Sequence, residues 1–162
     1  MIVFRPSARF VASHPAHWIA FGFGAGLAPF APGTAGTLAA WPVGWLLGAW
    51  FAPQILLAIA AACFLVGVWA CDATGRRLGV PDHGAMVWDE ITAFLLVLAI
   101  LPRSLEWQAA GFVLFRFFDI VKPPPIRWFE RRTHGGFGVM FDDLLAAAYT
   151  LLCLALAKRI LF

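Results

Sequence analysis

Charged side chains are scarce in this sequence, and their scarcity argues against a soluble fold. Only 13% of the 162 residues are charged and 62% are hydrophobic, whereas about 25% of the residues in a soluble domain are charged. No Asp, Glu, Lys or Arg occurs from Phe10 to Cys71. A soluble domain of this size could not cover its core with so little polar surface, so the composition predicts an integral membrane protein.

Cysteine is also rare, and the spacing of the three cysteines suggests neither a disulfide framework nor a metal site. Cys63 and Cys153 lie in apolar segments, where free cysteine behaves as a small hydrophobic residue. Cys71 and Arg77, in CDATGRR, have the Cys-x5-Arg spacing of cysteine-dependent phosphatases. No histidine precedes Cys71, the loop has a single glycine, and no clear helix start activates the thiol. We therefore do not expect a thiolate mechanism.

Apolar segments of membrane-spanning length follow one another along the chain. A spanning helix needs roughly 17–25 residues. The predicted spans are 36–52, 54–71, 85–101, 107–121 and 144–162, of which 107–121 is short. A further apolar stretch, 18–30, is short and rich in glycine, and predicts a re-entrant or interfacial element. The fold class expected is therefore all-α, a polytopic membrane helix bundle of about five spans that forms a single domain over residues 1–162.

The basic residues favour one orientation of these spans. With a cytoplasmic N-terminus, segments 1–35, 72–84 and 122–143 share one side of the membrane and carry eight Lys and Arg, against Arg103 alone in the opposite loops. This bias agrees with the positive-inside rule. The net charge of +3 is concentrated in these loops, so it reports topology and not nucleic-acid binding.

Several carboxylates lie on the predicted cytoplasmic side, at or near the ends of spans. They are Asp89, Glu90, Asp119, Asp142 and Asp143. Ionisable residues in a span are costly and mark functional sites, and clustered carboxylates repel one another unless a cation lies among them. Mg²⁺ prefers oxygen ligands of this kind. We expect these five residues to form a Mg²⁺ and catalytic site, with one carboxylate of each adjacent pair facing the metal, because neighbours on a helix point about 100° apart.

Residues suited to phosphate accompany the carboxylates. The candidate phosphate-binding residues are Thr34, Gly36, Thr37, Lys122, Gly135 and Gly136, with His134 as a phosphate donor or proton-transfer group. PGTAGT is expected at a helix start, where free N–H groups attract anions and Thr37 could cap the helix. HGGFG is expected to be a flexible loop rich in donors. Lys122 follows Asp119 by three residues and is either a phosphate ligand or its ion-pair partner.

Together these motifs resemble a known family. GFGAGLAPFAPGTAGTL, DHGAMVWDE and FRFFDIVKPPPIRWFERRTHGGFGVMFDD closely resemble the bacterial phosphatidylglycerophosphatase A family, in order and over most of the chain. The resemblance implies a Mg²⁺-dependent lipid phosphatase of the bacterial inner (cytoplasmic) membrane, with its site on the cytoplasmic face. The implied substrate is an anionic phospholipid in the bilayer, phosphatidylglycerol phosphate, whose terminal phosphate is removed to give phosphatidylglycerol in phospholipid biosynthesis. Thr92–Ala93 and Ala148 depart from the family at positions where glycine is expected.

The alternative function is a membrane cation channel or transporter lined by carboxylates. Its acidic residues should follow a path toward the middle of the membrane, whereas those of this sequence gather at one predicted face. A purely structural subunit would need neither the carboxylate pairs nor the HGG motif.

Overall fold

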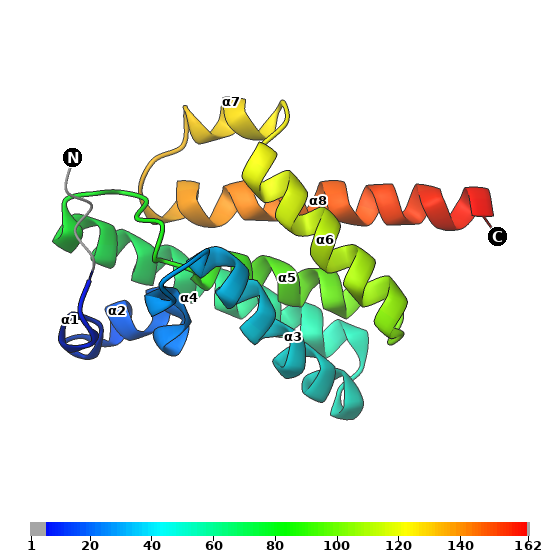
Figure 1. Ribbon diagram of the computed structural model, residues 1–162, viewed down its shortest axis with the longest axis horizontal. Helices are drawn as coiled ribbons and strands as arrows, with labels where there is room; N and C mark the ends of the chain where they lie inside the picture. Colours follow the sequence, from blue (N-terminus) through cyan, green and yellow to red (C-terminus); the bar gives the residue numbers. More distant parts are fainter. Residues whose placement is uncertain (1–5, 162) are drawn as a thin grey trace.

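The structure, a computed structural model, describes residues 6–161, which contain helices and no strands (Figure 1). The predicted all-α fold is confirmed. In chain order the elements are α1 (Ala8–Ala12), α2 (Pro15–Ala20), the short 3-10 helix η1 (Gly22–Leu27), α3 (Pro32–Trp50), α4 (Pro53–Leu78), α5 (Trp88–Ile100), α6 (Leu105–Val121), α7 (Ile126–Glu130) and α8 (Gly135–Leu161).

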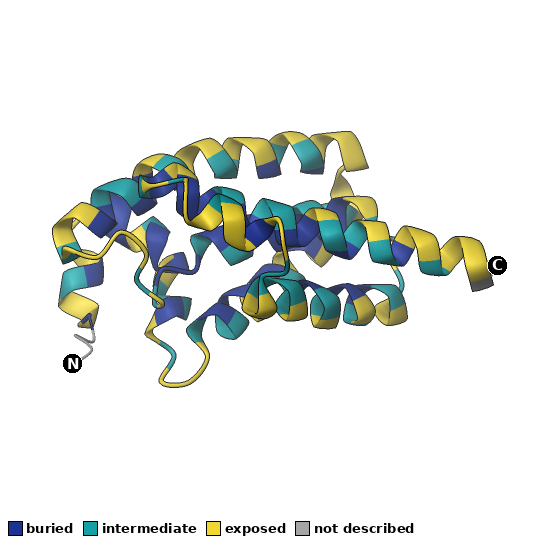
Figure 2. Cartoon of the chain, turned by 90° about the horizontal axis from the view of Figure 1, so that it is seen from above, coloured by how far each residue is buried: buried dark blue, intermediate teal, exposed yellow. Residues whose placement is uncertain are grey.

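Helix α5 lies at the centre of the bundle. It packs against α3, α4, α6 and α8, and most of its residues are buried. Figure 2 shows that the buried segments gather inside the bundle. Phe94 is fully buried and contacts Phe115 of α6 and Trp41 of α3 through their rings. The middle of α5 therefore meets α3 and α6 inside the protein.

Proline and glycine set the ends of the helices. Pro32 and Pro53 occupy the first turns of α3 and α4, where a missing N–H costs nothing. Gly79, with φ of 70°, ends α4 in the left-handed conformation that glycine adopts readily. The prolines at 123–125 stop α6 at Val121 as predicted, because proline cannot continue a helix.

The number of membrane spans is not confirmed. Two helices among the described residues, α4 and α8, are long and apolar enough to cross a membrane. The predicted span 85–101 corresponds to α5, which has 13 residues and is therefore about 20 Å long, shorter than the hydrocarbon core of a bilayer. The segment 18–30 contains the end of α2 and the whole of η1.

The prediction that HGGFG is a flexible loop is wrong. Gly135 begins α8, so this segment forms the first turn of the helix, and the predicted span 144–162 starts about two turns too late. A Cβ atom at Gly136 would overlap the carbonyl oxygen of Val68 and lie 2.7 Å from the backbone nitrogen of Asp72. The glycine thus allows the start of α8 to pack directly on the backbone of α4.

This contact predicts that Gly136→Ala destabilises the fold. The atoms in the way belong to the backbone of α4, which cannot rotate aside as a side chain could, so we expect a loss of about 2 kcal/mol or more. Thermal unfolding in detergent micelles would measure it. Gly84→Ala is the matched control, because nothing lies within 4 Å of the added Cβ atom. Equal unfolding midpoints for the two variants would contradict the prediction.

Candidate functional site

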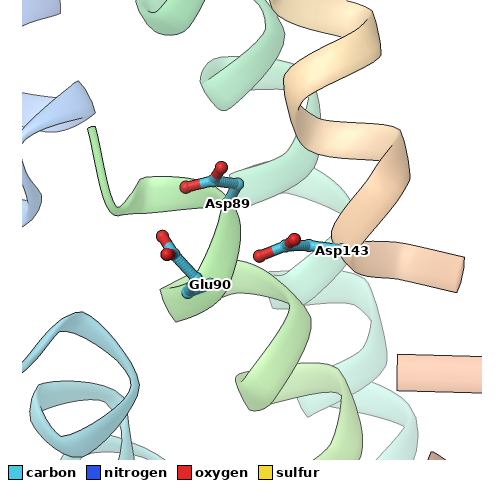
Figure 3. A group of neighbouring side chains, drawn as sticks. All are labelled: Asp89, Glu90 and Asp143. Carbon is cyan, nitrogen blue, oxygen red and sulfur yellow. The ribbon is translucent and has the colours of Figure 1, made fainter. Parts of the chain in front are cut away.

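Three carboxylates meet where α5 and α8 pack together. Asp89 and Glu90 come from the first turn of α5, and Asp143 comes from α8 (Figure 3). One oxygen of each carboxylate lies within 4.8 Å of one oxygen of each of the others. Asp89 and Asp143 are only 8% and 3% exposed. The site is therefore a compact group of acids that is largely shielded from solvent.

The chain fixes the first turn of α5 through the residue that precedes it. The N–H of Val87 donates to the carbonyl of Ala20 at 2.8 Å, which ties the start of α5 to α2. The side chain of Val87 is fully buried against Gly22 and Gly36, whose missing Cβ atoms leave room for it. The acidic pair that follows lies at the helix N-terminus, where the helix dipole favours negative charge.

Arg116 of α6 is the cation next to these acids. Its guanidinium donates to Asp119 at 2.5 Å and to Glu90 at 3.4 Å, and all three side chains are at most 14% exposed. It therefore links α6 to the first turn of α5. Of the two roles expected for Lys122, the ion pair with Asp119 is not what the structure has, because Arg116 holds that carboxylate.

Lys122 supplies a second cation, at the end of α6. Its ammonium lies 2.6 Å from Glu130 of α7 and 3.4 Å from Asp142 of α8. Burial alone would lower the pKa of Lys122, but the hydrogen bond to Glu130 and the nearby carboxylates outweigh it, so this pKa lies above the ordinary lysine value. Lys122 is therefore positively charged throughout the neutral range and joins three helices.

These two cations leave part of the negative charge without a partner. Buried oxygens of Asp89, Glu90, Asp142 and Asp143 have no hydrogen-bond partner within the described residues. Oxygens of Asp89, Glu90 and Asp143 lie within 4.8 Å of one another, and carboxylates so close together are stable only with a shared proton or a cation. The donor set is oxygen only and buried, so Asp89, Glu90 and Asp143 fit a hard divalent cation.

The start of α3 also reaches the site, through a residue that the sequence analysis missed. A Cβ atom at Gly33 would overlap Oε1 of Glu90 and lie 3.0 Å from both terminal nitrogens of Arg116. The glycine between Pro32 and Thr34 is the only signal for this role in the sequence, and PGT is also common in turns. The close contact at Gly33 involves side chains of α5 and α6, which lie far from it in the sequence.

The three residues of the PGTAGT motif that were predicted to bind phosphate have different surroundings. Thr34 is partly exposed, whereas Gly36 is buried against Val87. The hydroxyl of Thr37 is fully buried and donates to the carbonyl of Gly33 at 2.9 Å. Thr37 does not cap α3, which begins at Pro32 and has no side-chain cap.

The HGG motif lies beside α4. The N–H of Gly136 donates to the Asp72 carboxylate at 3.4 Å, and Asp72 also pairs with Arg76. Gly135 lines a cavity of about 210 Å³ together with Asp72 and Arg76. His134 is exposed, and no bond to its ring is found in the part of the chain that the structure describes. Asp72 therefore holds the first turn of the helix that carries Asp142 and Asp143.

The cysteine that matches the phosphatase spacing is not placed for catalysis. Cys71 is fully buried in a cluster with Ala70 and Met140. Arg77 is exposed at the end of α4 and lines a cavity that Cys71 does not reach. A phosphate could not contact both the thiol and the guanidinium in this arrangement.

The model of the family described as phosphatidylglycerophosphatase A matches residues 18–158 of this chain. The chain belongs to the phosphatidylglycerophosphatase A family. The matched range includes every carboxylate of the site, both cations and Gly33, so the resemblance noted in the sequence is confirmed.

Two relatives carry the family name. The phosphatidylglycerophosphatase A of Haemophilus influenzae is 46% identical over 149 residues, which cover 91% of each chain. That of Escherichia coli is 45% identical over 140 residues, which cover 86% of this chain and 81% of the relative. A Bacteroides thetaiotaomicron protein, provisionally named a phosphatidylinositol-3-phosphatase, is 37% identical over 151 residues, 88% of this chain and 93% of its own. No solved structure is significantly similar to the chain.

The ion pairs of Arg116 predict a large effect of its removal on stability. Arg116→Gln leaves Glu90 and Asp119 buried without their cation, which typically costs about 3–5 kcal/mol. The double variant Arg116→Gln with Glu90→Gln should recover part of the loss, because it removes one of the two unpaired charges. Thermal unfolding of the three proteins in detergent micelles measures both effects. A single variant as stable as the parent would mean that the pairing carries no net stabilisation.

Proposed function

We propose that this protein is a membrane phosphatase that removes the terminal phosphate of phosphatidylglycerol phosphate to give phosphatidylglycerol, in phospholipid biosynthesis. The family and the two relatives that bear its name support the reaction. The single observation that carries the proposal is the meeting of Asp89, Glu90 and Asp143 in one group, next to two cations that leave part of its charge uncompensated.

We also propose that the site works with Mg²⁺ held by Asp89, Glu90 and Asp143, while Asp119 and Asp142 complete the acidic surroundings. The ion would neutralise phosphoryl oxygens and activate a water molecule. Phosphate monoester hydrolysis is extremely slow in water, so a site needs both effects. The unpartnered buried oxygens described above support a cation at this position.

The remaining residues bind and orient the phosphate in this proposal. Lys122 is held among carboxylates at the mouth of α6, where its ammonium can exchange Glu130 for a phosphate oxygen. Arg116 keeps Glu90 and Asp119 in place. A carboxylate outside the metal-binding group, Asp119 or Asp142, would accept the proton of the attacking water. His134, exposed at the start of α8, would donate a hydrogen bond to the phosphate or transfer a proton.

The protein is proposed to lie in the cytoplasmic membrane as a multi-pass protein with its site on the cytoplasmic side. Its long apolar helices α4 and α8 support membrane insertion. The outer surface supports it too, since large apolar residues such as Trp50, Leu65 and Ile160 are at least 70% exposed. A soluble monomer rarely exposes so much apolar surface.

The proposed function predicts strict dependence on a divalent cation. Protein stripped with EDTA should lose at least about 100-fold in phosphate release from phosphatidylglycerol phosphate, and Mg²⁺ should restore it. Asp143→Asn should lower activity as strongly with Mg²⁺ present. Full turnover in chelator would exclude the metal site. Faster phosphate release from phosphatidylinositol 3-phosphate than from phosphatidylglycerol phosphate would contradict the proposed substrate but not the proposed metal site.

Cys71→Ala should retain most of the activity. The thiol is fully buried in the core, so its removal takes away a small apolar group and no reacting atom. Phosphate release by the purified variant, with thermal unfolding as the control for folding, measures this. Loss of turnover in a folded variant would instead point to a thiolate mechanism.

The proposed topology predicts which residues are accessible from outside the cell. In a cysteine-free version, Glu106→Cys should react with a membrane-impermeant thiol reagent in intact cells, and Gly84→Cys only after permeabilisation. Both positions are exposed, and a side chain at Gly84 meets nothing within 4 Å. Labelling of both in intact cells would contradict the proposed orientation.

A further inference from the structure

A second cavity lies outside the carboxylate site. Its volume is about 400 Å³, and it is lined by Ser13, His14, His17, Ala73 and Arg77. These residues come from α2, from the turn before it and from the last turns of α4. The residues of α4 that face α8, such as Asp72, line the smaller cavity instead. The two cavities thus use different faces of the same helix end.

The lining of this cavity is basic and rich in hydrogen-bond donors, and contains no acidic residue. Arg77 is exposed and has no ion-pair partner among the described residues. Nδ1 of His14 accepts from the N–H of Ala16 at 3.1 Å, so in the neutral ring the proton lies on Nε2, which is a donor. A guanidinium and a ring N–H at one cavity are suited to an anion.

His17 forms a fixed wall of the cavity. Its Nδ1 lies 2.9 Å from the buried hydroxyl of Thr74, and its ring stacks on Phe10 with the centroids 4.5 Å apart. Burial, with smaller effects of His14 and Arg77, lowers the pKa of His17. The ring of His17 is therefore mostly neutral at pH 7, and Arg77 supplies a permanent positive charge to the cavity.

An apolar stripe on α4 leads to the cavity. Leu65, Val66 and Trp69 are 70%, 41% and 50% exposed, and at helical spacing they share a face with Ala73, which lines the cavity. The Trp69 ring lies 6.3 Å from the ring of His14, centroid to centroid. Tryptophan favours the boundary between lipid tails and headgroups. The stripe and the cavity therefore match the two parts of a phospholipid.

We infer that this cavity binds the phosphate headgroup of an anionic phospholipid whose acyl chains lie along the exposed stripe of α4. The inference uses the membrane placement proposed above and does not depend on hydrolysis. The lipid is a phosphodiester and is held through Arg77 and His14, with Trp69 at the level where its tails begin. The site would retain a lipid beside the enzyme without placing it among the carboxylates.

Binding of phosphatidylglycerol, which lacks the terminal phosphate, tests the inference. Protein in neutral detergent micelles with EDTA would be titrated with phosphatidylglycerol or phosphatidylcholine, and bound lipid would be counted by native mass spectrometry. We expect phosphatidylglycerol to bind more tightly, and Arg77→Gln to weaken it about tenfold, as loss of a charged hydrogen bond does. His14→Asn should weaken it less, because a neutral hydrogen bond is weaker than a charged one, and asparagine still caps α2 so that the helix stays folded.

The neighbouring Arg76→Gln is the matched control. It removes the same charge from the same turn of α4, but Arg76 lines the other cavity, so its affinity should stay within about twofold of the parent. Equal losses for Arg76→Gln and Arg77→Gln would overturn the inference in favour of general attraction of anions. Thermal unfolding of each variant confirms that it is folded.

Two further arms distinguish lipid binding in this cavity from lipid binding at the carboxylates and from binding of a free anion. Glu90→Gln, in the carboxylate site, should bind phosphatidylglycerol as the parent does, and loss of binding there would move the lipid to that site and overturn the inference. Inorganic phosphate at millimolar concentration should not displace the lipid. Binding of inorganic phosphate that depends on Arg77, without binding of phosphatidylglycerol, would show an anion site and exclude the lipid.

Discussion

The burial of several carboxylates at one meeting point of helices is the constraint on which the structure depends. A buried carboxylate is stable only with hydrogen bonds or a cation, and α5, α6 and α8 each contribute at least one here. Arg116 holds α6 to α5 through Glu90, and Lys122 holds the end of α6 to α8 through Asp142. The ion pairs that partly compensate the acids therefore also decide how three helices are joined at this end of the bundle.

Electrostatic compensation is combined with close backbone packing. Gly33 lets α3 approach Glu90 and Arg116, and Gly136 lets α8 lie on α4. The second contact also brings the N–H of Gly136 to the Asp72 carboxylate. Each of these two glycines lacks a Cβ atom, and a Cβ atom at either position would force the neighbouring helices apart. The geometry of the site therefore depends on the absence of side chains at Gly33 and Gly136.

The sequence was informative about polar residues and less informative about their neighbours. Motifs predicted that the acids of 88–90, 116–122 and 142–143 would come together, because polar residues are so rare in the rest of the chain, and α5, α6 and α8 do meet there. The partner of Asp119 could not be derived, since Arg116 and Lys122 both lie three residues from it. Only the rotation of α6 against α5 decides that Arg116 takes this role.

In the proposed membrane placement, the length of α8 would set the depth of the acids that it carries. The helix has 27 residues and is therefore about 40 Å long, against about 30 Å for the hydrocarbon of a bilayer. The excess of about 10 Å equals roughly seven residues, and seven residues, 135–141, precede Asp142 in the helix. If the opposite end of α8 is level with the far boundary of the hydrocarbon, Asp142 and Asp143 lie at the near one. The length of the helix would then place these two acids at the level of the lipid phosphate groups, just outside the acyl chains.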